Sequence, residues 1–454
     1  MHIAFFCLPE HGGYVPTFHI TKRLLALGHR VTYYGPLDFE ERVRNQGFDY
    51  VSLYPEEIVR GTVDVDAFPD GAVATIRHIR GLLRLLAQRG RWEALNGVAD
   101  NALAPMLRAN GVDLVLVDGL FNFIVPLIAA SGIPYQVYLT ELSGAHSRRI
   151  PPSYSGAIPG EGGALARLAI RLSWAQALPK LLNPVMIRLL YIGLPQPPKP
   201  LLRRARQQIA DSARRAGMQR SLWEYGMRWT NTEVVLCPSA FDFPEAREGR
   251  TYAGPCIDLE RKDWSFPWNE FESRHQGRRI VLVSLGTHAA QYGGTTTQFL
   301  RKVFELASGC ADLFFVVALG KGRSVDSIGV PPENVMAFPF LPQLDLLERA
   351  SAMVTNGGLG TVKECIWFRV PMVVAPCNFD QPGNAARVVH HGIGRRVDVA
   401  RVKVPQLQEA IRACLDDAAI AGKIGAMSAA FRDSGEHEQW IAGIVSHGTA
   451  GVAA

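Results

Sequence analysis

The stretch that decides the fold is Ala352-Met353-Val354-Thr355-Asn356-Gly357-Gly358-Leu359-Gly360-Thr361. Its first four residues predict a buried strand, its glycines predict a tight turn, and Thr361–Phe368 predicts a helix that begins at the turn. Glycines let the backbone come close to a ligand, and a helix N-terminus offers free N–H groups at the positive end of its dipole. The three elements together predict a phosphate-binding site, to which Thr361 adds a hydroxyl donor.

Polar residues flank this unit at positions where a parallel sheet would bring them to the same edge. Glu364 lies further along the predicted helix, and its carboxylate is suited to accept hydrogen bonds from a pair of ribose hydroxyls. Asp380 and Gln381 follow the next predicted strand, Pro371–Ala375. An acid and an amide side by side suit a sugar, whose hydroxyls need several donors and acceptors at fixed positions.

A second turn of the same kind, Ser284-Leu285-Gly286-Thr287, follows the predicted strand Ile280–Val283. Either turn alone is as often a plain strand-to-helix connection as a phosphate site. The ordered series of motifs carries the prediction, and it lies within a regular alternation of strands and helices. The strands predicted for this half are Ile280–Ser284, Leu313–Ala318, Asn334–Phe338, Ala352–Thr355 and Pro371–Ala375.

The first half of the chain repeats the alternation. Its predicted strands are His2–Leu8, Arg30–Tyr34, Tyr50–Leu53, Leu114–Val117, Tyr135–Leu139 and Val234–Cys237, with a helix over Pro16–Leu27. We therefore expect two Rossmann-like, doubly wound α/β domains of parallel sheets that face a central cleft. The predicted divisions are a domain over 1–254, a linker over 255–278, a domain over 279–430, and a helix and tail over 431–454 that packs back on the first domain.

Composition and charge exclude several classes of protein. With 454 residues, 48% hydrophobic and 20% charged, the chain is globular and long enough for two domains. The net charge of +6 is concentrated in one arginine-rich segment. A nucleic-acid-binding segment would interleave aromatic residues with side chains that read bases. This pattern is not apparent there, so we expect no nucleic acid partner.

Cysteines and hydropathy indicate the compartment. The seven cysteines are an odd number without a CxxC pair, which favours buried thiols in a reducing compartment over disulfides or a zinc site. The N-terminus carries no basic region, and no apolar run reaches the roughly 18 residues of a spanning helix. We expect a cytoplasmic protein, soluble or bound to a membrane surface.

Leu165–Arg215 combines many leucines with many arginines and ends in a proline cluster. One interpretation is a pair of core helices whose arginines extend to solvent. The other is a lid over an apolar acceptor pocket, or an amphipathic surface that rests on a membrane as a peripheral contact. The sequence leaves these alternatives open.

Four pieces in order carry a resemblance to a known family: Phe340-Leu341-Pro342-Gln343, Asn356 to Glu364, Pro371, and Asp380-Gln381-Pro382-Gly383-Asn384. They resemble the nucleotide-sugar glycosyltransferases of the GT-B fold, specifically the UDP-glycosyltransferase (GT1) family. That family shows W-x-P-Q-x-x-L-L, then H-x-G-x-x-S-x-x-E, then P, then D-Q-x-x-N. The chain departs from the pattern at Phe340, where the family has Trp, and at Asn356, where it has a His that touches phosphate.

The resemblance implies a donor site, with a UDP- or TDP-sugar as co-substrate and no cofactor. Phe340, Leu341, Pro342 and Gln343 would hold the base and ribose, and Glu364 the ribose hydroxyls. Asp380 and Gln381 would hold the donor sugar. The residues implied at the diphosphate are Ser284, Gly286, Thr287, Asn356, Gly357, Gly358, Gly360 and Thr361. A neutral amide still donates a hydrogen bond, so we expect binding to survive at Asn356 with altered strength.

The family begins with a strand, G-H-x-x-P, and a helix that ends R-G-H-x-V-T; Leu27–Thr32 fits the last piece. In the predicted loop Pro9–Pro16, Gly13 stands where the family has its catalytic base. A neutral histidine is suited to accept a proton near pH 7, so we expect His11 to be the base after a rearrangement of the loop, with His19 a weaker alternative. Asp118 ends a predicted strand and corresponds to the acid that orients the base.

The activity implied is inverting transfer of a hexose to a hydroxyl or carboxyl of a lipophilic small molecule or lipid, as in secondary metabolism. The alternative is a non-catalytic nucleotide-sugar-binding protein with a degenerate base position. A metal-dependent transferase would use Asp64-Val65-Asp66, but that motif lies far from the phosphate-like turns, and we expect no metal. A nicotinamide oxidoreductase would need G-x-G-x-x-G after the first strand, which is absent.

Overall fold

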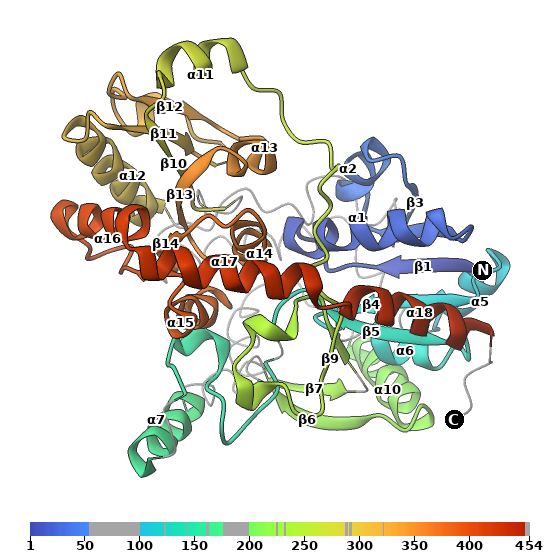
Figure 1. Ribbon diagram of the computed structural model, residues 1–454. Helices are drawn as coiled ribbons and strands as arrows, with labels where there is room; N and C mark the ends of the chain where they lie inside the picture. The colour runs from blue at the N-terminus through green and yellow to red at the C-terminus, as the bar shows by residue number, and fades with distance from the viewer. Residues whose placement is uncertain are drawn as a thin grey trace.

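The computed structural model describes residues 1–53, 100–121, 124–142, 144–159, 163–175, 199–223, 226–230, 233–286, 289, 293–320 and 322–449. These residues form two α/β domains that lie side by side in Figure 1. Each domain has a sheet in which every assigned strand pair is parallel. Thr287 and Asp64–Asp66 fall outside the described residues, as does 176–198 within the leucine- and arginine-rich segment.

The sheet of the first domain has the order β3-β2-β1-β4-β5-β8-β9. Its strands are β1 (His2–Phe6), β2 (Arg30–Gly35), β3 (Asp49–Ser52), β4 (Leu114–Asp118), β5 (Tyr135–Leu139), β8 (Glu233–Val235) and β9 (Thr251–Tyr252). Its helices are α1 (His11–Ala26), α2 (Glu40–Asn45), α5 (Leu103–Ala109), α6 (Val125–Ala129), α7 (Ala164–Ala175) and α10 (Lys199–Arg215). The antiparallel hairpin β6 (Gln219–Trp223) and β7 (Gly226–Thr230) forms a separate two-stranded sheet.

The sheet of the second domain has the order β12-β11-β10-β13-β14-β15, the doubly wound order 3-2-1-4-5-6. Its strands are β10 (Arg279–Ser284), β11 (Leu313–Ala318), β12 (Val335–Phe338), β13 (Ala350–Thr355), β14 (Met372–Val374) and β15 (Gly394–Arg396). Its helices are α11 (Trp268–His275), α12 (Gly293–Ser308), α13 (Gln343–Leu347), α14 (Leu359–Trp367), α15 (Gln381–His391), α16 (Val404–Asp416) and α17 (Ala418–Asp433).

The central strands form where the sequence has unbroken apolar runs. All five residues of β1 and of β4 are buried, as expected of parallel strands covered by helices on both faces. Every predicted strand has a counterpart in the sheets. The two-domain α/β fold predicted from the sequence is thereby confirmed.

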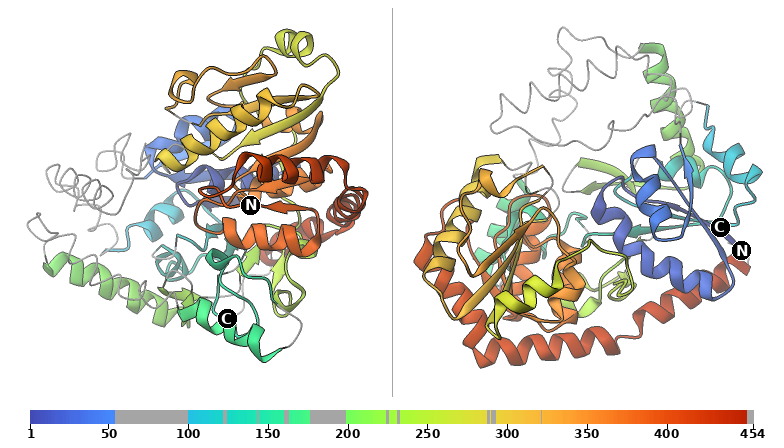
Figure 2. Two further views of the ribbon diagram at one scale, coloured as in Figure 1. Left: turned by 90° about the vertical axis from the view of Figure 1, so that its left-hand side faces the viewer. Right: turned by 90° about the horizontal axis from the view of Figure 1, so that it is seen from above.

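The chain passes between the domains twice. The first passage runs from β9 to α11, whose Phe271 is fully buried in the core of the second domain. The second passage is made by α17 and α18 (Glu436–Thr449), which run from the second domain to the first along the lower edge of the right-hand view of Figure 2. Trp440 and Ile441 of α18 are buried in the same cluster as Ile3, so the C-terminal helix is part of the core of the first domain.

The prediction of a loop over Pro9–Pro16 was wrong, because α1 begins at His11 and includes Pro16. The sequence indicated a later start because proline is disfavoured inside helices. Glu10 is extended, and its carbonyl oxygen accepts a hydrogen bond from the N–H of Gly13 at 3.0 Å, which closes the first turn. His11 is therefore held on a helix.

The helix α7 has two different faces. Ile170 and Trp174 are buried, whereas Leu168 and Leu172 are 50% and 59% exposed. One face of α7 is therefore buried and the other faces solvent, and both interpretations of the segment stay open. Within the described residues, none of the helices has the length and apolar content needed to span a bilayer.

Candidate functional site

The two glycine turns of the second domain lie next to each other at the carboxyl ends of β10 and β13. Ser284 pairs in register with Thr355, so the turns that follow these residues start at the same level. Gly286 and Gly357 have φ values of +82° and +86°, which only glycine adopts without strain. A Cβ atom on Gly286 would lie 2.8 Å from Asn356 Nδ2, so this amide lies directly across the second turn.

The amide of Asn356 is buried and oriented by its own turn. Its Oδ1 accepts hydrogen bonds from the N–H of Gly358 and the hydroxyl of Thr355, both at 3.4 Å. The Nδ2 group is then the part of the side chain that could donate to a phosphate oxygen. Gly358 is the N-cap of α14, and space is open around a Cβ built on Gly360 in the first turn. These residues combine the glycine turn and the helix N-terminus that an anion requires.

The carboxylate of Glu364 lies at the centre of a polar cluster. Its Oε2 accepts a hydrogen bond from Gln343 Nε2 at 2.5 Å, and the same amide nitrogen lies 3.3 Å from the hydroxyl of Thr361. The guanidinium of Arg261, a residue of the interdomain linker, contacts both carboxylate oxygens. Gln343, Thr361 and Glu364 therefore lie together in the structure. The guanidinium of Arg261 also belongs to this cluster, and the sequence motifs did not indicate it.

The positive charge of Arg261 is compensated although its guanidinium is buried. Burial alone would lower the pKa of Arg261, but the carboxylates of Glu364 and Asp263 outweigh this effect and raise it. Asp263 Oδ1 accepts from Arg261 Nε at 3.0 Å.

The residues before Gln343 have different environments. Phe340 stacks on Trp264 of the linker, with ring centroids 4.5 Å apart and an angle of 15° between the rings. Leu341 is buried in the core of the second domain, and Pro342 is the N-cap of α13. Of this predicted base-binding motif, only Phe340 and Gln343 therefore offer side chains at the site, while Leu341 and Pro342 fix their positions.

Asp380 and Gln381 begin α15 directly after the loop that follows β14. Asp380 Oδ2 accepts a hydrogen bond from Asn384 Nδ2 at 2.8 Å, and the same Nδ2 also donates to the carbonyl of Gly357 at 2.9 Å. This amide connects the predicted sugar residues to the glycine turn after β13. Burial raises the pKa of Asp380 to about 6, and the negative charge of Glu10 from the first domain adds to the effect.

The oxygen of Gln381 is already engaged within its own loop. Oε1 accepts from the backbone N–H groups of Cys377 and Asn378 at 2.8 and 3.0 Å. Gln381 could therefore serve a ligand through its Nε2 group. The preceding Phe379 is 47% exposed and has a φ of +53°, a strained value for an aromatic residue. Sequence reasoning missed Phe379, because its type does not signal the backbone conformation.

In the first domain, Asp118 ends β4 and is fully buried. Its Oδ1 accepts from the N–H of Leu120 at 2.9 Å, and its Oδ2 from the N–H of Leu8 and the hydroxyl of Thr140 at 3.4 and 3.3 Å. By holding Leu8, Asp118 fixes the segment that leads into His11. A Cβ on Gly13 would lie 2.3 Å from the carbonyl oxygen of Leu8, so the position aligned with the family base cannot carry a side chain here.

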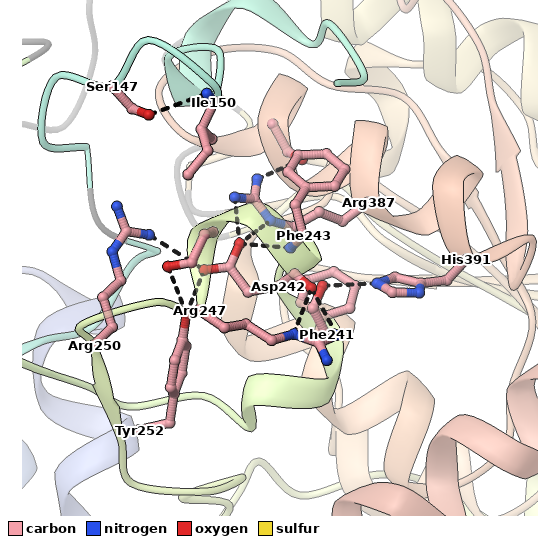
Figure 3. A network of polar contacts seen from close by, with 12 residues as sticks. Ser147, Ile150, Phe241, Asp242, Phe243, Arg247, Arg250, Tyr252, Arg387 and His391 are labelled. Atoms are coloured by element: carbon pink, nitrogen blue, oxygen red, sulfur yellow. Dashed lines mark hydrogen bonds and ion pairs between the residues drawn. The ribbon is translucent and has the colours of Figure 1, made fainter. Parts of the chain in front are cut away.

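A buried ion pair joins the two domains beside this site (Figure 3). Asp242 of the first domain is fully buried, and its Oδ1 accepts from Nε and Nη2 of Arg387 on α15 at 2.9 and 2.6 Å. Tyr252 donates to the other carboxylate oxygen at 2.8 Å, and Arg250 reaches the same atom at 3.4 Å. The helix that begins with Asp380 and Gln381 is therefore fixed to the first domain. Sequence reasoning missed this pair, because its partners are 145 residues apart.

Two grooves lie outside the predicted donor residues. One of about 320 Å³ is lined by His146, Ser147, Arg148, Arg171 and Trp174 of the first domain. Another of about 570 Å³ lies between Gly156–Ile158 and β15, and it includes Pro376 and Pro382, which flank the Asp380 loop. Within the ranges that the structure describes, histidine, cysteine and acidic side chains do not gather in a group that could hold a metal ion.

Comparison with known proteins assigns the fold. The model of the Erythromycin biosynthesis protein CIII-like C-terminal domain family matches residues 307–433. The 4'-demethylrebeccamycin synthase of Lentzea aerocolonigenes is 25% identical over 414 residues, which cover 90% of each chain.

Two solved structures cover nearly the whole chain. The glycotransferase of kitacinnamycin superposes with a TM-score of 0.63 and 24% identity, covering 98% of this chain and 97% of that one. Glycosyltransferase VinC in complex with dTDP gives a TM-score of 0.61 and 16% identity over 99% of each chain. The GT-B fold predicted from the sequence is confirmed, as is the resemblance to nucleotide-sugar glycosyltransferases.

Proposed function

We propose that this GT-B glycosyltransferase moves a hexose from a UDP- or TDP-sugar to a hydroxyl or carboxyl of a lipophilic acceptor, with inversion and without a metal ion. The observation that carries the proposal is the convergence of three kinds of group at one sheet edge. Phosphate donors around Gly357, the carboxylate of Glu364 and the acid–amide pair at the start of α15 are joined there by short contacts. These groups match the diphosphate, ribose and sugar of one donor molecule.

The diphosphate is proposed to lie over the two glycine turns. Backbone N–H groups of the first turn of α14 and the amide of Asn356 would donate to its oxygens, and the helix dipole would favour its charge. The hydroxyl of Ser284 and the backbone at Gly286 would complete the cradle from the neighbouring strand. The complex of the structural neighbour VinC with dTDP supports a donor of this class.

The sugar is proposed to lie at the start of α15. Asp380 would accept hydrogen bonds from its hydroxyls, and Gln381 would donate through Nε2. Because Asn384 ties Asp380 to the phosphate turn, one rigid unit would hold both parts of the donor. This arrangement would expose the anomeric carbon towards the first domain.

His11 is proposed as the base, with Asp118 as its positioning residue. A neutral imidazole would remove the proton of the acceptor hydroxyl as the oxygen attacks the anomeric carbon, and the nucleoside diphosphate would leave from the opposite face. This single displacement inverts the anomeric configuration. Support comes from the place of His11 at the first residue of α1 and from Asp118, which accepts a hydrogen bond from the N–H of Leu8 shortly before this helix.

The acceptor is proposed to be a lipophilic natural product or lipid that enters from the first domain. The groove at Trp174 is lined by the rings of Trp174 and His146, whose centroids are 4.9 Å apart, and by two arginines. Such a lining suits a flat apolar compound that carries an acidic or polar group. The exposed Leu168 and Leu172 support a peripheral contact with a membrane that supplies such acceptors. The cysteines are free and mostly buried, which fits a cytoplasmic site.

One observation favours a second candidate, a nucleotide-sugar-binding protein without transferase activity. The position that aligns with the family base is Gly13, and backbone atoms fill the space where its side chain would be. If His11 does not act as the base, the donor site remains and transfer is lost.

The experiment that separates these functions measures binding and product in the same sample. UDP- and TDP-sugars are titrated calorimetrically, and a library of lipophilic alcohols and acids is then screened by mass spectrometry for a gain of one hexose. A transferase binds a donor and yields such a product with inverted anomeric configuration. Donor binding without product across the library supports the second candidate, and absence of binding overturns both.

A further inference from the structure

Four residues of the interdomain linker, Arg261–Trp264, run across the predicted nucleoside end of the donor site, and we call them the strap. In Figure 1 the chain descends from α11 past α2 towards β9, between the two domains. Gln46, which ends α2, holds the strap through both backbone groups of Lys262, at 3.1 and 3.3 Å. The strap is thus anchored to the first domain while two of its side chains reach the second.

The first of these side chains, Arg261, covers the carboxylate of Glu364. Its Nη1 and Nη2 groups contact Oε1 and Oε2, respectively, and Gln343 donates a further hydrogen bond to Oε2. The side chain of Glu364 is only 6% exposed. In this arrangement a pair of ribose hydroxyls cannot reach the carboxylate, because the guanidinium lies where they would bind.

The second side chain, Trp264, covers Phe340. The two rings are nearly parallel, with centroids 4.5 Å apart, which is the geometry of an aromatic stack. A uracil or thymine base that stacked on this face of Phe340 would need the same space. Trp264 is itself 48% exposed, so its displacement would disrupt little other packing.

Together these contacts reproduce those of a nucleoside. A flat ring stacks on Phe340, and three residues away a pair of donors binds both oxygens of Glu364, as a base and the hydroxyls of its ribose would do. We propose that the strap competes with the nucleoside of the donor for these contacts, so that donor binding displaces Arg261 and Trp264. This inference rests on the proposed function, since it takes Phe340 and Glu364 as nucleoside-binding residues.

The strap would set donor affinity through the nucleoside and leave the phosphate contacts unaffected. Two contacts hold this part of the linker on the first domain: Gln46 binds the backbone of Lys262, and Lys22 pairs with Asp258 at 2.7 Å. Release of the strap would therefore also loosen one interdomain connection. Donor binding and interdomain movement would then be coupled at the linker.

The test uses the full-length protein and measures the Kd of UDP and of inorganic pyrophosphate by calorimetry. The Trp264→Ala variant removes the stacked ring at a half-exposed position and should fold normally. We expect it to bind UDP about threefold to tenfold more tightly than the wild type, with unchanged affinity for pyrophosphate. Lys262→Ala, at an exposed position of the same strap, is the matched control and should bind both ligands like the wild type.

A second readout is backbone amide exchange of the wild type over residues 259–265. Displacement of the strap predicts faster exchange in this segment when UDP is added. Slower exchange together with weaker UDP binding by Trp264→Ala would overturn the inference, because Trp264 would then be a wall of the site. Unchanged UDP affinity in Trp264→Ala also overturns it, and failure of every variant to bind UDP overturns the proposed function itself.

Discussion

The carboxyl edges of the two sheets share the same strand arrangement but carry different side chains. In both domains the first strand and the fourth strand of the doubly wound order lie side by side, and a helix with glycine in its first turn begins at this edge. In the second domain, Gly360 leaves open space at the start of α14, and polar side chains converge around it. In the first domain, Gly13 is pressed against the carbonyl of Leu8, and the histidine stands two residues earlier.

Topology determines where a ligand binds in such a fold, while single residues determine the chemistry at that place. The edge of the second domain carries a complete set of groups for a nucleotide-sugar. The edge of the first domain carries one histidine and one buried acid. Donor binding and transfer are therefore separable properties, which the following variants are designed to separate.

The largest effect is expected from His11→Ala. Loss of a general base lowers kcat by about 10²- to 10⁴-fold, whereas the Kd of the donor should stay within a factor of two (about 0.4 kcal/mol). Steady-state kinetics with calorimetry measures both. His19→Ala, in the same helix, is the control and should keep its kcat; a loss of kcat there with normal turnover by His11→Ala would exchange their roles.

The next largest effect is expected at the ion pair of Asp242 and Arg387, which joins the two domains. Arg387→Ala leaves Asp242 buried without its main partner, and the free energy of unfolding should fall by about 3–5 kcal/mol, measured with urea. Arg412→Ala breaks the exposed pair with Asp312 and should cost no more than about 1 kcal/mol. Equal losses in the two variants would contradict the interdomain role.

The same pair has a pH dependence of known sign. Burial would raise the pKa of Asp242, but Arg387 and Arg250 outweigh it and lower the pKa below its usual value of 3.8. The contribution of this group to stability is therefore present above about pH 4 and lost as the pH falls through the lowered pKa. Urea unfolding from pH 6 to pH 3 should show this decline in the wild type and a smaller one in Arg387→Ala.

A pair of glycine substitutions compares the two edges directly. Gly360 and Gly12 both lie in the first turn of a helix, and a Cβ on either meets no atom within 4 Å. Gly360→Ala should stabilise the protein by about 0.5 kcal/mol, because alanine favours the helix, yet weaken UDP binding about tenfold, because the methyl group enters the phosphate space. Gly12→Ala should leave UDP binding unchanged. Equal UDP affinities in both variants would place the diphosphate elsewhere.

The smallest effect is expected from the titration of Asp380. As the pH falls through about 6, its carboxylate gains a proton and loses acceptor capacity for sugar hydroxyls. The Kd of UDP-glucose should rise about threefold between pH 7 and pH 5, relative to that of UDP, which carries no sugar. Because the pKa is raised in the fold, the stability from this group changes in the opposite direction and is lost as the pH rises through 6. Asp380→Asn should abolish both trends.

The sequence predicted those features that depend on neighbouring residues. The strand, glycine turn and helix from Ala350 to Trp367 are local, and the apolar run and the glycines specify them. The predicted start of α1 was wrong, because Pro16 indicates a break, whereas the helix begins at His11 and includes this proline. The sequence does not indicate the ion pairs of Arg261 with Glu364 and of Arg387 with Asp242. Each pair joins residues that are more than 100 positions apart and lie on different sides of a domain boundary.

The most direct test of the account is a calorimetric titration of UDP-glucose into the wild type, Gly360→Ala and His11→Ala. We expect one site per chain in the wild type, about tenfold weaker binding in Gly360→Ala, and unchanged binding in His11→Ala. Binding that is lost in His11→Ala and kept in Gly360→Ala would contradict the assignment of the donor site to the second domain.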